Sequence, residues 1–349
     1  MTQFQTERAV GATNVGRRNH NEDAYLLRPK SGLVLVADGV GGHHAGEVAS
    51  AITCNTIADE VTAGAGLQQA VRAANRAVME AVRTGNGKQG MASTVVAASV
   101  DEEGFEVAWV GDSRAYLWDG QLKLLTRDHS LLERLIASGE ITRDEVKDHP
   151  QRNVIIQAIG LQSEDSLRVD INGGSLPEGA ILLLCSDGMS DVLENAEIAA
   201  ILCRELPLQE RCDLLVGTSI ANGGKDNSTV ILVSGNGPVT EHQEPNVVWR
   251  YDPSTGAVEG LTEATAAAPQ LRKVGPKAAA EDSESPRTTQ MMSVADVEKE
   301  LARRGQSSSN SPAAQDADTA PAKIPGWLIG VATAVIVIAA SVMVFLNRG

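Results

Sequence analysis

The sequence has few cysteines and fewer basic than acidic residues. The first shortage argues against a thiolate centre and the second against binding of nucleic acid. Its four cysteines form no C-x-x-C pair, which disfavours a centre built on thiolates. Reduced, buried thiols are the simpler interpretation of Cys54, Cys185, Cys203 and Cys212. Lysine and arginine number 30 against 45 acidic residues, a formal net charge of −15 in 349 residues, which argues against nucleic acid as a partner.

Several short motifs are missing as well. The glycines at 39–42 are not followed by Gly-Lys-Ser/Thr, so a nucleotide-binding enzyme is disfavoured. Zinc is disfavoured because no H-E-x-x-H pattern occurs. The N-terminus is polar and shows no signal peptide, so the catalytic part is expected to remain in the cytoplasm. A hydrophobic content of 42% nevertheless supports a substantial core.

A buried strand that ends on a carboxylate is the feature around which the chain is organised. The apolar run 33–37 stops at Asp38, and glycines follow. The same design returns where the run 181–186 leads into Asp187 and where Asp226 precedes the run 230–233. Converging carboxylates repel one another unless a hard cation lies between them, so the pattern predicts an oxygen-ligated metal centre.

Five motifs carry a family resemblance: Arg18-x-x-Asn21-Glu22-Asp23, Asp38-Gly39-Val40-Gly41-Gly42-His43, Gly111-Asp112-Ser113-Arg114, Ser186-Asp187-Gly188 and Asp226-Asn227. In order and approximate spacing the chain resembles the metal-dependent, type 2C serine/threonine phosphatases of the bacterial branch over residues 6–234. An isolated Asp-Gly is ordinarily a turn, whereas five motifs in order are specific. The resemblance implies an α+β fold, an α-β-β-α sandwich of two antiparallel sheets flanked by helices.

The resemblance also implies a cofactor of two Mn²⁺ or Mg²⁺ ions. Asp38 would bridge the two ions, and Asp187 and Asp226 would hold one of them. Glu22 and the carbonyl of Gly39 would serve the other ion, partly through water. A hydroxide bridging the ions would then attack phosphorus in line.

Three further motif residues receive roles from the resemblance. Asp23 would orient water at the metal site. Arg18 would clamp the phosphate, because a guanidinium fork matches two phosphate oxygens, and the adjacent Arg17 is interpreted as a surface residue. Asp112 matches the acid that helps bind a third, weaker ion in bacterial members, with a turn carboxylate as the alternative, and Arg114 would pair with a carboxylate.

The histidines receive no catalytic role. The animal branch places a general-acid histidine directly after the metal-loop Asp-Gly, and this chain has Val40 there. His43 and His44 are therefore interpreted as residues of a helix entry or rim. His129 and His149 are interpreted as structural or flap residues, and the stretch 139–150 resembles the mobile flap beside the family's active site.

Apolar periodicity predicts the main elements of the folded part. Helices are expected over 47–61, 67–83, 196–205 and 209–221. Strands are expected over 92–100, 105–110, 115–118, 167–171, 180–186 and 228–233. The predicted catalytic domain covers residues 1–236.

Beyond this domain the composition changes twice. Residues 237–323 are rich in Ala, Pro, Ser and Thr and predict a disordered linker, with a transient hairpin over 247–251 and 257–261 as an alternative. Residues 324–346 form a nearly unbroken apolar run that predicts one transmembrane helix, followed by a short tail, 347–349. The protein is thus expected at the inner membrane as a single-pass C-terminal anchor, with its catalytic domain in the cytoplasm.

The predicted function is metal-dependent hydrolysis of phosphoserine and phosphothreonine in proteins. Its partners would be phosphorylated proteins and a cognate serine/threonine kinase or the substrates of that kinase, and one phosphorylated regulatory protein is an alternative target. The competing hypothesis is a catalytically inactive, phosphatase-like binding module tethered to the membrane. That hypothesis expects the metal carboxylates to be lost, whereas Asp38, Asp187 and Asp226 are all present.

Overall fold

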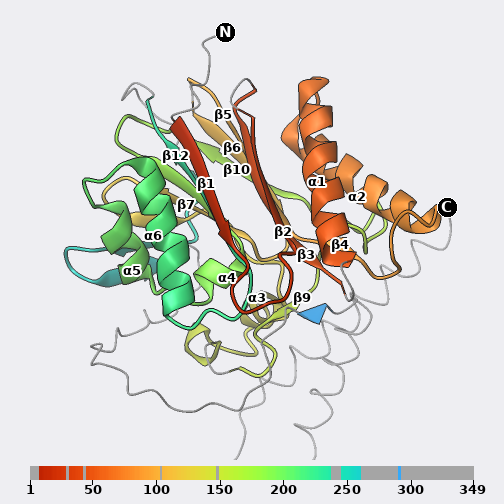
Figure 1. Cartoon of the computed structure of the whole chain (residues 1–349). Helices are drawn as coiled ribbons and strands as arrows, with labels where there is room; N and C mark the ends of the chain where they lie inside the picture. Colours follow the sequence, from red (N-terminus) through yellow and green to blue (C-terminus); the bar gives the residue numbers. More distant parts are fainter. Residues whose placement is uncertain are drawn as a thin grey trace, which may run out of the picture. The chain divides into compact units, whose positions relative to one another are not determined.

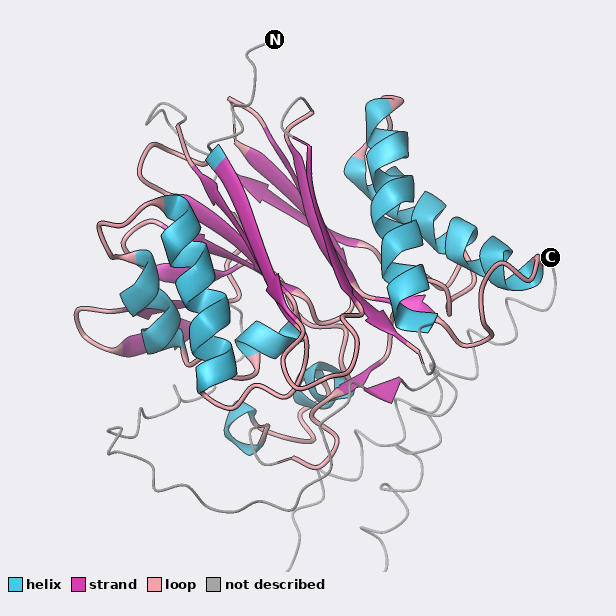
Figure 2. Cartoon of the chain, viewed as in Figure 1, coloured by secondary structure: helices cyan, strands magenta, loops and turns pink. Residues whose placement is uncertain are grey.

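A computed structural model describes residues 8–28, 31–41, 45–102, 104–146, 149–236, 245–260 and 290–291. These residues all belong to the first of two units into which the chain divides, residues 1–299. Within this unit two antiparallel sheets lie face to face, and helices cover the outer face of each (Figure 1, Figure 2). The predicted sandwich of two sheets flanked by helices is confirmed.

The first sheet has six strands and carries the strand that ends near Asp38. In spatial order they are β10 (Asp170–Gly174), β6 (Phe105–Val110), β5 (Val95–Val100), β3 (Leu33–Val40) and β2 (Asp23–Arg28), with β4 (Ala92–Ser93) paired to the end of β3. The predicted strand over 92–100 is interrupted at Thr94, because the Thr94 N–H turns to the carbonyl of Asp38. β10 begins later than predicted, since its ladder starts with Asp170 opposite Trp109.

The second sheet has seven strands. In spatial order they are β1 (Ala9–Asn14), β12 (Ser228–Ser234), β11 (Ile181–Cys185), β7 (Arg114–Trp118), β8 (Leu122–Leu124), β13 (Trp249–Asp252) and β14 (Ala257–Gly260). The two central strands β11 and β12 are the apolar runs that the sequence places next to Asp187 and Asp226.

Helices complete the outer layers. α1 (Ala45–Thr62) and α2 (Leu67–Arg83) pack on the six-stranded sheet, close to their predicted bounds. α4 (Asp187–Ser190), α5 (Asn195–Leu202) and α6 (Leu208–Ala221) pack on the seven-stranded sheet. α3 (Leu131–Ala137) and the 3-10 turn η2 (Arg143–Glu145) belong to the connection that follows β8.

The alternation of side chains along β3 shows how the layers are held together. Leu33 and Leu35 face α1 and α2, whereas Val34 and Val36 face the seven-stranded sheet. All four are fully buried, which is why this strand reads as a continuous apolar run rather than as an alternating one. The core therefore lies on both faces of β3 and fixes the position of Asp38 at its end.

The cysteine prediction is correct for three of the four thiols. Cys54, Cys185 and Cys212 are buried and free. Cys203 is exposed, because α5 ends at Leu202 and Cys203 forms the C-cap on the solvent side. Its place in an apolar pattern was therefore misleading.

The hairpin that the sequence offers as an alternative over 247–251 and 257–261 is present as β13 and β14, so this part of the stretch 237–323 is folded. β13 pairs with β8 and adds two strands to the sheet, so the folded part continues to residue 260. Tyr251 is buried, and the ring of Trp249 packs edge-on against Tyr116, with centroids 5.9 Å apart. The hairpin thus covers the otherwise open edge of β8, which a composition-based prediction does not detect.

The predicted transmembrane segment, residues 324–346, lies outside the described residues, as do the short tail and most of the linker. Within the described ranges, none of the helices combines the length and apolarity that a membrane crossing requires. His43 and His44 also lie outside the described residues.

Candidate metal centre

The predicted acidic residues come from strand ends and loops at one end of the two sheets. Asp38 lies near the end of β3, and the register of β2 places Asp23 directly opposite it. Asp187 opens α4 immediately after β11, and Asp226 stands just before β12. Asp112 follows β6, so both sheets contribute carboxylates.

The pKa of Asp38 shows that these carboxylates converge. Burial raises this pKa well above its usual value, and four neighbouring carboxylates raise it further. In order of effect they belong to Asp23, Asp187, Asp226 and Asp112. The structure thus brings together acids that lie as far apart in the sequence as Asp23 and Asp226.

The backbone of Asp38 is fixed by the break between β4 and β5. The Thr94 N–H donates to the Asp38 carbonyl at 2.8 Å, and the Ser93 hydroxyl donates to the same oxygen at 3.1 Å. The Thr94 hydroxyl accepts from the Asp38 N–H at 3.3 Å and lies 2.7 Å from the hydroxyl of Ser113. Because Ser113 follows Asp112, Thr94 links two acidic loops, a role that the sequence analysis missed.

Asp23 is held by hydroxyls from the opposite sheet. Its Oδ2 accepts from Ser186 Oγ at 2.8 Å and from Thr229 Oγ1 at 2.6 Å. Its Oδ1 is buried and has no hydrogen-bond partner among the described residues. Burial, partly offset by the two hydroxyls, raises the pKa of Asp23 to about 6. Ser186 belongs to the motif Ser186-Asp187-Gly188, but no feature of the sequence connects it with Asp23.

Glu22 and Gly39 meet beside the first turn of α1. A Cβ atom built on Gly46 would lie 2.7 Å from both Glu22 Oε1 and the carbonyl oxygen of Gly39. A side chain at position 46 would therefore fill the space between the two groups predicted to serve one ion. Burial raises the pKa of Glu22, while Arg18 and the Gly46 backbone N–H lower it. Gly46 was not identified from the sequence.

Arg18 lies within the site and Arg17 does not. Nη2 of Arg18 donates to Oδ2 of Asp226 at 2.6 Å, and both side chains are about one-quarter exposed, at 22% and 24%. Arg17 is exposed. The structure therefore brings Arg18, and not Arg17, to a predicted metal ligand, while its role as the phosphate ligand stays a prediction.

The side chain of Asn227 holds the loop that carries Arg18 and Glu22 in place through hydrogen bonds to its backbone. Its side-chain oxygen accepts from the Glu22 N–H at 2.7 Å, and its side-chain nitrogen donates to the carbonyls of Val15 and His20 at 2.9 and 3.0 Å. The residue is buried, so these bonds are shielded from water. Its place next to Asp226 in the motif was the only sequence signal for this role.

Asp112 is buried among further carboxylates. Burial, Asp128 and Asp191 raise its pKa to about 7, and Arg114 lowers it. Arg114 forms a two-pronged ion pair with Asp128 at 3.0 and 2.7 Å, the predicted kind of carboxylate partner. Oδ1 of Asp112 has no partner in the described part of the chain. Asp191, four residues after Asp187, lies close enough to raise the pKa of Asp112 and was not identified from the sequence.

His129 supports the loop of Asp112. Its backbone N–H donates to the Gly111 carbonyl at 2.8 Å, and its Nδ1 accepts from the Gly111 N–H at 3.3 Å. Its ring stacks on Trp109, with centroids 6.2 Å apart, and its Nε2 lies 3.4 Å from Oδ2 of Asp170. The predicted structural role of His129 agrees with these contacts.

The donor set fits hard divalent cations. It consists of carboxylates and one carbonyl, the ligands that Mn²⁺ and Mg²⁺ prefer, and two of its buried carboxylate oxygens have no described partner. Over the described ranges, no three His, Cys, Asp or Glu side chains are already arranged as a closed set of ligands.

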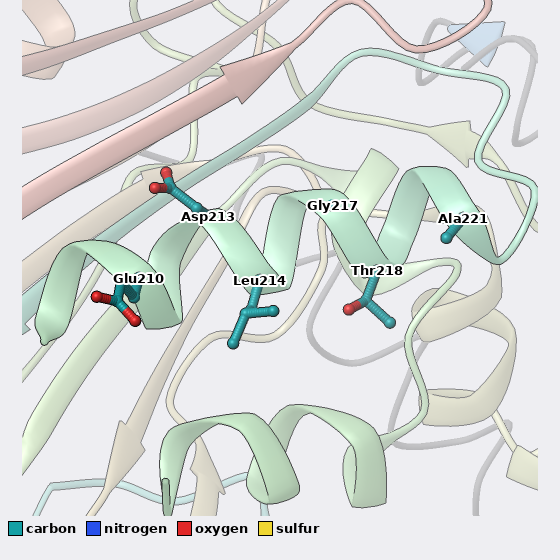
Figure 3. A pocket seen from close by; sticks show the side chains of 6 residues that line it. All are labelled: Glu210, Asp213, Leu214, Gly217, Thr218 and Ala221. Carbon is teal, nitrogen blue, oxygen red and sulfur yellow. The ribbon is translucent and has the colours of Figure 1, made fainter. Parts of the chain in front are cut away.

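Two cavities of about 440 Å³ lie elsewhere. One is on the outer face of α6, opposite its buried face, and it is lined by Glu210, Asp213, Leu214, Gly217, Thr218 and Ala221 (Figure 3). The other lies beside β10, where Asn246 and Asn172 exchange hydrogen bonds. Neither contains a predicted site residue.

Known proteins resemble this chain in sequence and in fold. A family model described as protein phosphatase 2C matches residues 10–213. The serine/threonine phosphatase stp of Listeria innocua is 35% identical over 239 residues, which cover 64% of this chain and 94% of that protein. The solved structure of the Mycobacterium tuberculosis serine/threonine phosphatase PstP/Ppp gives a TM-score of 0.60 at 31% identity, over 66% of this chain and 98% of that one. A PstP catalytic domain in complex with two manganese ions gives 0.57 at 30%, over 66% and 98%.

Proposed function

The chain belongs to the protein phosphatase 2C family, and from that premise we propose that it dephosphorylates proteins modified by a bacterial serine/threonine kinase at the inner membrane. The enzyme is a serine/threonine phosphatase, and its cofactors are Mn²⁺ or Mg²⁺. One observation carries the proposed site: buried carboxylates gather around Asp38, with the guanidinium of Arg18 at their edge.

The chain's own residues divide the work of binding the ions. Asp38, at the centre of the carboxylate cluster, would contact both, and Asp187 and Asp226 would hold one. Glu22 and the Gly39 carbonyl, which face the same space beside Gly46, would hold the other. When bound, such ions supply a nucleophile from water at neutral pH and neutralise charge on the phosphoryl group.

Asp23 and Arg18 act on the remaining partners of the reaction. The free Oδ1 of Asp23 can accept a hydrogen bond from water, because Ser186 and Thr229 hold the other oxygen and fix the orientation of the carboxylate. Arg18, whose guanidinium lies at the edge of the cluster beside Asp226, would hold the phosphate through hydrogen bonds to its oxygens. The groups that would hold the cations and the phosphate thus lie side by side.

An inactive binding module is less well supported. That hypothesis expects carboxylates to be lost, whereas Asp38, Asp187 and Asp226 are all retained, and the carboxylates of Asp187 and Asp226 both raise the pKa of Asp38, which supports a shared site. Buried carboxylates that lie close together repel one another and lower the stability of the fold. Their retention is therefore explained more simply if the working protein binds cations between them.

The membrane context rests on the sequence. Residues 324–346 are long and apolar enough to cross a bilayer, and the linker from residue 261 would reach roughly 45 Å as a flexible coil. Such a tether would raise the effective concentration of phosphorylated partners in the same membrane.

Phosphate release from a phosphothreonine peptide tests the activity of this chain. The full chain is assayed with Mn²⁺, with Mg²⁺ and with a chelator, beside Asp38→Ala and Asp187→Ala. We expect release that needs metal and that both substitutions abolish. Metal-independent release, or full activity of either variant, would contradict the proposed site.

Cell fractionation tests the tether. Removal of residues 324–349 should move the protein from the membrane to the soluble fraction and leave turnover of a soluble phosphopeptide unchanged. If the shortened protein stays with the membrane, residues 324–346 are not the anchor. A collapse of turnover would show that they do more than tether.

A further inference from the structure

β9 (Val154–Ile155) is a short strand beside the loop of Asp112. Ile155 bridges Ser130 in antiparallel fashion, and the Ile156 N–H donates to the His129 carbonyl at 2.8 Å. His129 in turn holds Gly111, the residue before Asp112, through two hydrogen bonds. One side of β9 is therefore connected to the loop of Asp112 through His129, which bonds to Ile156 on one side and to Gly111 on the other.

The segment that follows β9 also reaches the loop of Asp38. Ile159 and Ser93 exchange two backbone hydrogen bonds, at 3.0 and 2.8 Å. The hydroxyl of Ser93 donates to the carbonyl of Asp38 at 3.1 Å. Residues 154–159 therefore connect the structural supports of Asp38 and Asp112, and anything laid along β9 lies next to the carboxylate end of the sandwich.

The other edge of β9 is taken by the chain's own distant residues. β15 (Gln290–Met291) pairs with β9 in parallel, with Gln290 opposite Val154 and Met291 opposite Ile155 (Figure 1). These residues follow the hairpin by about thirty positions and belong to the stretch that composition assigns to the linker. The pairing is a backbone ladder, and the side chains of β9 are buried.

An edge of this kind is suited to an extended peptide. The N–H and C=O groups along an unpaired strand edge form a template that a further strand completes, with affinity from main-chain hydrogen bonds. Such an edge accepts many sequences, because the backbone carries most of the recognition. A phosphoserine or phosphothreonine in a flexible segment approaches an enzyme in extended form and offers the same backbone groups.

We propose that the outer edge of β9 is a docking edge for an extended peptide, that its resident occupant is the chain's own segment at residues 290–291, and that this occupancy limits access of phosphoproteins to the carboxylate site. The proposal names a regulation of the proposed phosphatase site and rests on that function for its last part. Its first two parts concern binding alone.

Competition by an attached segment has a calculable effect. Only the molecules with an open edge bind substrate, so the apparent KM equals the intrinsic value divided by the open fraction. An edge that is occupied half of the time therefore raises the apparent KM about twofold and leaves kcat unchanged. A small substrate that needs no docking edge is unaffected.

Proline substitution in the segment provides the test. Gln290→Pro with Met291→Pro removes two backbone N–H groups and prevents strand pairing without touching the folded part. The matched control, Ala278→Pro with Ala279→Pro, places the same change elsewhere in the linker sequence. Full-length proteins in mild detergent are compared by amide hydrogen exchange over residues 151–159 and by kinetics on a phosphothreonine peptide and on p-nitrophenyl phosphate.

We expect faster exchange at Ile155 in the Gln290/Met291 variant alone, with Ile156 as an internal reference because its N–H donates to the His129 carbonyl on the other side of β9. Its KM for the phosphopeptide should fall by about twofold or more, with p-nitrophenyl phosphate hydrolysis unchanged. Unchanged exchange would overturn the docking. Faster exchange with an unchanged or higher KM would overturn the competition. Protection that is lost on dilution would assign the occupant to a second copy and overturn the intramolecular form.

The two readouts keep this proposal separate from the function itself. If the wild-type chain hydrolyses no phosphopeptide under any metal condition, the proposed function fails, while hydrogen exchange still reports whether residues 290–291 dock on β9. If the wild-type chain is active and exchange does not respond, the docking fails and the function stands.

Discussion

Arg18 and Asp226 are bound to each other, with Nη2 of the arginine 2.6 Å from Oδ2 of the aspartate. Arg18 is the proposed phosphate ligand and Asp226 is a proposed metal ligand. In the ion pair, Arg18 therefore takes the place of a cation on Asp226, and Asp226 takes the place of a phosphate on Arg18. A cation on Asp226 would release Arg18 toward the phosphate. Metal binding and phosphate binding should therefore be coupled, and the coupling must be reciprocal.

Arg18→Ala should separate these two effects. Loss of a charge-assisted hydrogen bond to phosphate is worth about 1.5–3 kcal/mol, so we expect KM for a phosphothreonine peptide to rise about 10- to 100-fold. Mn²⁺ binding should be no weaker, because the variant frees Asp226 from a competing cation. Steady-state kinetics and titration calorimetry with Mn²⁺ measure the two quantities.

Arg17→Ala is the matched control, since it removes an equal charge one residue away. Arg17 is exposed, so its removal should change KM by no more than about twofold, the size expected for a screened surface charge. If the two variants behave alike, the general charge of the loop matters and the ion pair with Asp226 does not. Weaker Mn²⁺ binding by Arg18→Ala would also contradict the idea that Arg18 and a metal ion compete for Asp226.

The sequence predicted those site residues that stand next to a recognisable apolar run. Asp38, Asp187 and Asp226 each follow or precede an apolar strand, and such strands are the most reliable sequence signal for buried β-structure. The order of the five motifs then distinguished a metal site from a set of unrelated turns. Two antiparallel sheets flanked by helices came from the resemblance, because periodicity cannot select how strands are ordered in space.

The missed residues act through partners distant in sequence. Thr229 donates to Asp23 from 206 positions away, and Asn227 binds the Glu22 backbone across 205. Gly46 matters because of the space between Glu22 and Gly39, which exists only after folding. The hairpin at β13 and β14 was underrated for the same reason: its apolar face is short, and only the edge of β8 makes it stable.

The pH dependence of stability should depend on metal. Asp23 and Asp112 have pKa values raised to about 6 and about 7, so between pH 4 and 7 the metal-free folded state binds more protons than the unfolded chain. Stability then falls as pH rises through this range, because proton uptake favours the folded state at the acidic end. Cations that hold the ionised carboxylates should oppose this fall.

Thermal unfolding with chelator and with excess Mn²⁺, over pH 4.5 to 8, measures this effect. We expect the Tm of the metal-free protein to decline toward neutral pH and the gap between the two Tm values to widen. Asp112→Asn should flatten the metal-free profile near pH 7, since it removes one of the two groups. A metal-free Tm that rises steadily to pH 8 would contradict the clustering of these carboxylates.

Gly46→Ala should damage metal binding without damaging the helix. The added methyl group would lie 2.7 Å from the Gly39 carbonyl oxygen and from Glu22 Oε1, and the carbonyl belongs to the backbone and cannot swing away. We expect Mn²⁺ affinity at one of the two sites to fall about tenfold or more, by analogy with disturbed ligand orientation in other metal sites. Calorimetric titration with Mn²⁺ resolves that site from the other.

Gly217→Ala serves as its control. Gly217 lies on the outer face of α6, where an added Cβ meets nothing within 4 Å, as the open cavity in Figure 3 illustrates. The substitution should stabilise the helix by up to about 1 kcal/mol and leave Mn²⁺ binding unchanged. An equal loss of Mn²⁺ affinity in both variants would refute a specific role for Gly46.

Truncation around the hairpin should show where the folded domain ends. A protein ending at residue 236 loses the pairing of β13 with β8 and the buried side chains of Val247 and Tyr251, whereas one ending at residue 262 keeps them. Burial of two such side chains is worth about 3–6 kcal/mol, and at this size each kcal/mol shifts Tm by about 2–4 °C. We expect the shorter protein to unfold about 10 °C lower or to aggregate through β8.

Tyr251→Ala in the longer protein tests the same contact without shortening the chain. It removes one buried ring and leaves the backbone pairing of β13 in place, so it should account for part of the loss, about 3–5 kcal/mol at most. Arg250→Ala, on the alternate face of the same strand, should cost less, because Arg250 is only partly buried. If both truncations and both substitutions leave the Tm unchanged, β13 and β14 contribute nothing to the domain. The boundary at residue 236 would then stand, because the edge of β8 would be stable without a partner strand.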